Sequence, residues 1–142
     1  MKQLFVLSII FLGLNSQSFA YSYDYFPENT VMAFKGQALG TDLDCYLYVT
    51  EVELNSPNKT DLRYVKIHTN YSYNQEETSE TIVTPVRENL LAGISMNNTD
   101  QIVISYDSKK GIESVRSFAL KWMKNNEETL SYCLDLQYLP RQ

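Results

Sequence analysis

The stretch Leu130-Ser-Tyr-Cys-Leu-Asp-Leu-Gln-Tyr138 decides the fold class. Its larger apolar side chains alternate with smaller or polar ones along the whole segment: Leu130, Tyr132, Leu134, Leu136 and Tyr138 against Ser131, Cys133, Asp135 and Gln137. Such alternation is typical of a β-strand with one face on a core, because successive side chains point to opposite faces. We therefore predict a strand over 130–138, with Cys133 on its polar, outer face.

A second segment, 44–54, alternates in the same way. Tyr46, Tyr48, Thr50, Val52 and Leu54 fall on one side, and Cys45, Leu47, Val49, Glu51 and Glu53 fall on the other. If the side that ends in glutamates is the outer one, Cys45 also faces outward. A disulfide between two outer faces then needs Cα atoms about 6 Å apart, as on neighbouring strands or across a barrel seam.

Further strands are predicted from β-branched and aromatic residues bounded by turn residues. They cover 31–39, 63–71, 81–86, 101–106 and 114–123, and Phe118, Leu120 and Trp122 share a side in the last of these. Residues 87–93 fit either a short helical turn or another strand. Seven or eight short strands predict an all-β antiparallel meander, in the form of a small closed or partly open barrel. A β-sandwich is the alternative.

The N-terminus predicts export. A basic Lys2 precedes an apolar run over 4–14, and Ser18-Phe-Ala20 supplies the small residues that a signal peptidase accepts. The run is too short for a membrane anchor, which needs roughly 20 apolar residues. We expect a signal peptide over 1–20 and one β domain over 21–142, secreted or periplasmic, in which Cys45 and Cys133 form a disulfide.

The charge balance disfavours two classes of partner. The chain has 12 basic and 17 acidic residues, and loss of Lys2 with the signal peptide leaves 11 basic ones. Nucleic acids and anionic membranes bind clustered cations. We therefore expect no nucleic-acid partner and no stable membrane insertion.

Motifs for catalysis, metals and cofactors are weak. The single histidine, His68, lies in a predicted strand with no nucleophile motif near it in sequence. Glu51 and Glu53 lie two apart on one strand face, roughly 7 Å between Cα atoms, so a hydrolase that uses these carboxylates remains one hypothesis. No metal or nucleotide motif is present, and the sequence predicts no catalytic residue, no metal site and no cofactor.

Tyrosine is the compositional oddity, with 11 residues. Tyrosine combines an apolar ring with a hydrogen-bonding hydroxyl, which suits protein and glycan surfaces. Two clusters are hard to explain as core, and they supply the predicted binding residues Tyr23, Tyr25, Tyr71 and Tyr73. The leading hypothesis is a non-enzymatic binding module for a protein or glycan surface, such as an inhibitor or adhesive module. A lipocalin-like carrier of a small apolar ligand is the second hypothesis, and its barrel would need an open interior.

Overall fold

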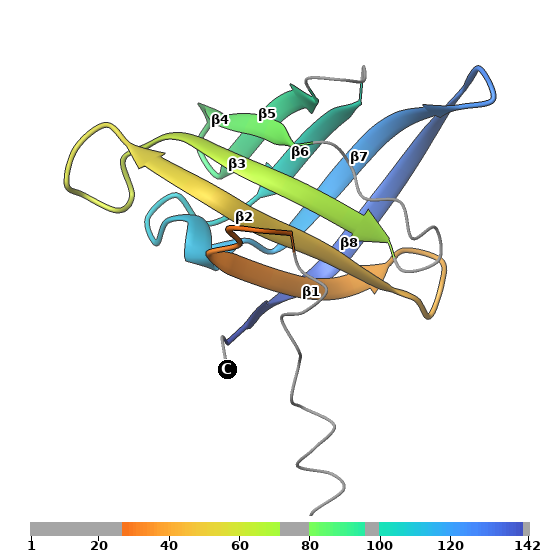
Figure 1. The fold of residues 1–142 in the computed structure, drawn as a ribbon, viewed down its shortest axis with the longest axis horizontal. Coiled ribbons are helices and arrows are strands. Elements are labelled where there is room, and N and C mark those ends of the chain that lie inside the picture. Colours follow the sequence, from red (N-terminus) through yellow and green to blue (C-terminus); the bar gives the residue numbers. More distant parts are fainter. Residues whose placement is uncertain (1–26, 72–79, 96–99, 141–142) are drawn as a thin grey trace, which may run out of the picture.

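The computed structural model describes residues 27–71, 80–95 and 100–140, and these form a closed antiparallel β-barrel (Figure 1). Each strand pairs with the next along the chain, and β1 also pairs with β8 to close the barrel. The strands are β1 (Met32–Ala38), β2 (Asp44–Leu54), β3 (Leu62–Tyr71), β4 (Thr81–Arg87), β5 (Leu90–Ser95), β6 (Gln101–Ser105), β7 (Ser117–Lys124) and β8 (Glu127–Leu139). The all-β prediction and the preference for a barrel are confirmed, and the sandwich alternative is wrong.

The ambiguous segment 87–93 belongs to a hairpin. β4 ends at Arg87 and β5 begins at Leu90, with Asn89 at a positive φ of 65° between them. Asn125 and Asn126 both have positive φ at the β7–β8 turn, which suits a tight hairpin with right-handed strand twist. One expected strand start is wrong, because Ile112–Ser114 forms the 3₁₀ turn η2 and β7 begins only at Ser117.

Two β-bulges overturn the expected strand faces. In β2 the pairing register shifts between Val49 and Glu51, so Thr50 is an extra residue that reverses the alternation. Cys45, Leu47 and Val49 are therefore buried inside the barrel before the bulge. After the bulge, Val52 and Leu54 pack on the core. Glu51 and Glu53 lie on the outer side, together with the residues of β3 opposite them.

The second bulge lies in β8. The β1–β8 register shifts between Lys35 and Gln37, and Asp135 opposite this point has a positive φ of 55°. Cys133 lies inside before the bulge and Leu136 lies inside after it. Leu130 and Tyr132 are exposed on the outside, contrary to the prediction that they face the core. The expectation that both cysteines face outward is also wrong, because each strand reverses its alternation at its own bulge, β2 at Thr50 and β8 at Asp135.

The barrel interior is packed by large apolar side chains. The largest fully buried ones include Phe34, Leu47, Ile67, Leu91, Ile104 and Phe118. Trp122 packs against this core, and its indole Nε1–H donates to Ser131 Oγ at 3.0 Å. Phe118, Leu120 and Trp122 thus share the inner face, as predicted. Burial of this apolar surface is the main stabilising contribution to the fold.

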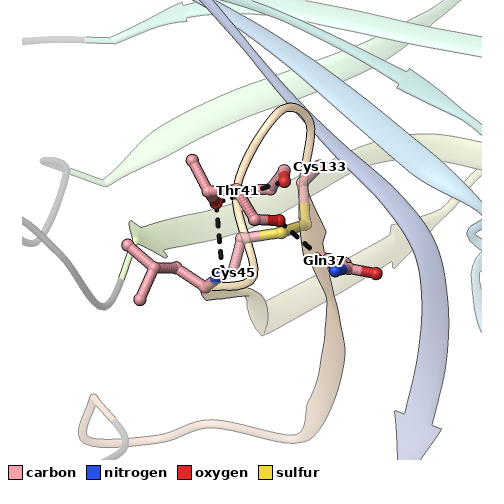
Figure 2. The surroundings of a disulfide bond; sticks show 6 residues. Gln37, Thr41, Cys45 and Cys133 are labelled. Atoms are coloured by element: carbon pink, nitrogen blue, oxygen red, sulfur yellow. Dashed lines mark hydrogen bonds between the residues drawn. A yellow bond between two sulfur atoms is a disulfide. The ribbon is translucent and has the colours of Figure 1, made fainter.

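The predicted disulfide joins β2 to β8 inside the barrel. Cys45 and Cys133 are bonded with Cα atoms 6.0 Å apart, and both residues are completely buried. The bond lies beside the β1–β2 turn, where Gln37 Nε2 donates to the carbonyl of Thr41 and Thr41 Oγ1 donates to that of Ala38 (Figure 2). Such a bond is compatible with an oxidising compartment. Within the described ranges, no helix has the length and apolarity needed to cross a membrane.

Candidate functional site

The four predicted binding tyrosines lie at or beyond the edge of the described chain. Tyr23, Tyr25 and Tyr73 are outside the described residues. The backbone of Tyr71 ends β3, opposite Cys45 of β2. Their role in binding therefore stays a prediction, and the candidate site is built below from side chains that the structure does place.

A polar network surrounds Glu51 on the outer side of β2 and β3. The hydroxyl of Tyr64 donates to Glu51 Oε1 at 2.8 Å, and Lys66 Nζ lies 3.1 Å from Glu51 Oε2. Lys66 and His68 also approach Glu80, at 4.0 and 3.9 Å. The Tyr64 hydrogen bond, followed by that of Lys66, lowers the pKa of Glu51, and the same contacts raise the pKa of Tyr64 and Lys66.

The contacts of Glu51 do not favour the role of a glycosidase general acid for this side chain. A glycosidase acid must keep its proton near neutral pH through a raised pKa. The pKa of Glu51 moves in the opposite direction because its partners stabilise the carboxylate. In the part of the chain that the structure describes, no three His, Cys, Asp or Glu side chains gather as a metal site.

We expect the variant Tyr64→Phe to raise the pKa of Glu51 toward its ordinary value, because the strongest of its hydrogen bonds is lost. A carboxylate with a lowered folded pKa stabilises the fold above its unfolded pKa, and this contribution disappears as the pH falls through the folded pKa. The acid-induced loss of stability near that pKa should therefore be smaller in the variant. NMR titration of the Glu51 carboxyl carbon measures the shift, and an unchanged pKa would contradict the assigned cause.

A stacked tyrosine pair lies on the outer face of β2. The rings of Tyr46 and Tyr48 have centroids 5.9 Å apart and planes 8° apart. Both were expected to point into the core, and the Thr50 bulge explains why they do not. Tyr48 nevertheless forms a small outer cluster with Ala33 and Leu139 and is only 4% exposed. A side chain that is covered to this degree offers little surface to a partner.

The opposite side of the barrel exposes apolar side chains. By register, Ala92 of β5, Val103 of β6, Ala119 of β7 and Tyr132 of β8 form one row across four strands. Val103 is 42% exposed and Tyr132 is 39% exposed. At a strand spacing of about 4.8 Å, the row spans roughly 14 Å.

Two further residues widen this row. Ile94 and Leu130 lie at the two ends of the neighbouring register row, with the polar Gln101 and Lys121 between them, and are 59% and 55% exposed. Each of them adjoins the first row on its own strand. We call the set Ala92, Ile94, Val103, Ala119, Leu130 and Tyr132 the outer apolar stripe. Contiguous exposed apolar surface marks interaction sites more often than scattered apolar residues do. The outer apolar stripe is therefore the candidate functional site.

Neither protein-family models, nor curated proteins, nor solved structures give a match to this chain. The candidate site consequently rests on its own geometry. Sequence reasoning missed it because its members come from four strands and meet only through the barrel register. The sequence carries one signal of this site, the apolar run over 102–104. Ile102 and Ile104 of β6 face the interior, so Val103 between them is an apolar residue on the outer face.

Proposed function

We propose that the chain is an exported, non-enzymatic binding module that recognises a protein surface through the outer apolar stripe, as an inhibitor or adhesive module would. The observation that carries this proposal is the exposure of Ile94, Val103, Leu130 and Tyr132 on β5, β6 and β8, which β7 joins through Ala119 into one face of the barrel. Mainly aliphatic side chains favour a protein over a glycan, because sugar rings stack on aromatic ones. The export signal predicted over 1–20 and the disulfide support a secreted or periplasmic location.

The two rival hypotheses have less support. A lipocalin-like carrier needs space inside the barrel, and the described interior is occupied by side chains such as Phe34, Phe118 and Trp122. A hydrolase that uses Glu51 as its acid needs a raised pKa, and the partners of Glu51 lower it.

We expect the double variant Ile94→Lys/Val103→Lys to lose at least about 90% of the partner that the wild type captures from its extracellular or periplasmic milieu, since buried charge is costly in an apolar interface. The control is Val31→Lys/Val86→Lys, which places the same two charges at valines that are 52% and 58% exposed and lie outside the outer apolar stripe. Quantitative mass spectrometry of the captured proteins measures the loss. Equal recovery by the double variant and the wild type would remove the stripe from consideration.

The same capture also tests the predicted tyrosine site. Tyr71→Ser changes the last residue of β3, and Tyr73→Ser changes the tyrosine two positions later in the sequence. If the stripe is the main binding surface, this variant keeps most of the captured partner. Loss with the tyrosine variant and retention with the double lysine variant would move the binding surface to these tyrosines.

A further inference from the structure

Strand β8 extends beyond the strand that closes the barrel. The last β1–β8 pair is Ala38 with Cys133, and the N–H of Leu39 donates to the carbonyl of Tyr132 at 3.0 Å. β8 begins earlier, at Glu127, and these first residues pair with β7 alone. In Figure 1 the β7–β8 hairpin accordingly runs on past the end of β1. Among the described residues, no strand covers this edge of β8 over 127–131.

The open edge carries backbone hydrogen-bonding groups. Because the carbonyl of Tyr132 points to the β1 side, the backbone groups of Leu130 and Glu128 point to the same side by the two-residue repeat of a strand. Those of Ser131 and Thr129 point to β7. A strand edge of this kind pairs with another extended chain.

A hollow of about 390 Å³ lies beside the open edge. It is lined by the β1–β2 turn and by β8, through Ala38, Leu39, Thr41, Thr129, Leu130, Ser131 and Tyr132. The apolar residues Leu39, Leu130 and Tyr132 are exposed on the outer side, while the hydroxyl residues Thr129 and Ser131 belong to the inner row of β8. The turn is held in place by the Thr41 hydrogen bonds drawn in Figure 2.

Two acidic residues lie close in sequence to the residues that line the hollow. Asp42 follows Thr41 in the β1–β2 turn, and Glu127 begins β8; both are exposed. Neither forms an ion pair with a described side chain, whereas Glu128 is neutralised by Lys121 at 3.0 Å. Basic residues at the ends of a bound segment would complement Asp42 and Glu127.

We infer that the open edge of β8 binds an extended segment of the partner protein by β-strand addition. The segment alternates apolar residues, which extend the outer apolar stripe beyond Leu130, with small hydroxyl residues that face the hollow, and it carries basic residues at its ends. This inference rests on the proposed function, and it names the form in which the partner reaches the same surface.

The test uses the capped peptide acetyl-Lys-Val-Thr-Val-Thr-Lys-amide and the mature wild-type protein. We expect binding, measured by NMR titration, with slowed hydrogen exchange at the Leu130 amide. Two further probes carry N-methyl groups on both valines or on both threonines, which removes the N–H groups of one peptide edge or the other. Only one of the two methylated peptides should lose binding, by at least tenfold. If both bind like the parent, or neither binds, strand addition is wrong.

In the protein, Leu130→Pro removes the N–H that points to the open edge of β8 and breaks no hydrogen bond to β7. The fold should therefore persist, because proline is tolerated at such edge positions. We expect at least tenfold weaker peptide binding, and a change within about twofold for the control Leu130→Val. If Leu130→Pro does not fold, the two methylated peptides still test strand addition on the wild-type protein. If the wild type forms a dimer and the peptide dissociates it, the open edge of β8 pairs with a second copy of this chain. That result would contradict the proposal that a segment of a partner protein occupies the edge.

The outcome separates this inference from the proposed function. Partner capture that is lost in Ile94→Lys/Val103→Lys but retained in Leu130→Pro would keep the stripe as the binding surface and exclude strand addition. Capture that is lost in Leu130→Pro and retained in both Leu130→Val and the double lysine variant would support strand addition and exclude Ile94 and Val103 as the main contacts.

Discussion

Loss of the Cys45–Cys133 disulfide should lower the melting temperature of the protein, prepared without the predicted signal peptide, by about 15 °C. The bond closes a loop with a sequence separation of 88. In the chain-entropy model such a loop constrains the unfolded chain enough to add about 4.5 kcal/mol of stability. Differential scanning calorimetry of the wild type and of Cys45→Ala/Cys133→Ala measures the difference. A change below a few degrees would show that the bond does not stabilise the fold in this way.

The buried position of the bond gives this experiment an internal control. Both cysteines are completely buried, so a reductant reaches the sulfur atoms only when the barrel opens. Reduction by dithiothreitol should therefore be slow in buffer and become fast in urea near the unfolding midpoint. If the thiols appear equally fast in both solutions, the native protein exposes the bond. Thiol titration over time makes this measurement.

Local patterns were sufficient to predict most of the strands, although they left 87–93 open and placed the start of β7 too early. The alternation in 44–54 and 130–138, and the asparagines at 125–126, express the preferences of single strands and turns, which depend on neighbouring residues in the chain. The pairing of Cys45 with Cys133 was also predictable, because a chain that is predicted to be exported and has two cysteines offers each of them one intramolecular partner.

The inward and outward faces were not predictable in the same way. A single extra residue at Thr50 reverses the alternation of β2, and a left-handed Asp135 does so in β8. Neither a threonine nor an aspartate indicates a bulge by itself, because a bulge depends on the register with the neighbouring strand. The glutamates at 51 and 53 were read correctly as outward, and the assignment of Cys45 failed only because strict alternation was extended across Thr50.

The candidate site was beyond sequence reasoning for a related reason. Val103 is one apolar residue in a short strand, and Tyr132 belongs to a segment whose face was inverted by the bulge. Their proximity requires the order β5-β6-β7-β8 and the register of each pair. Composition drew attention to tyrosine clusters instead, because abundance is visible without a fold and exposure is not.

The variant Gly93→Ala should lose about 3 kcal/mol of stability through steric conflict with β4. A Cβ atom at Gly93 would lie 2.1 Å from the carbonyl oxygen of Ile82 and 3.0 Å from a methyl group of Val83. The nearest atom belongs to the backbone, so no rotamer change relieves the contact and β5 must move away from β4. Glycine within a strand often marks such a close backbone approach.

Gly40→Ala is the matched control for this prediction. Gly40 has a φ of +80° and no atom within 4 Å of an added Cβ. Its substitution therefore tests backbone strain without a clash, at a cost of about 1 kcal/mol. Urea denaturation of the two variants and the wild type compares the unfolding midpoints at a common slope. Gly93→Ala should unfold at a clearly lower urea concentration than Gly40→Ala, and the reverse order would mean that β4 and β5 have room for a methyl group at this position.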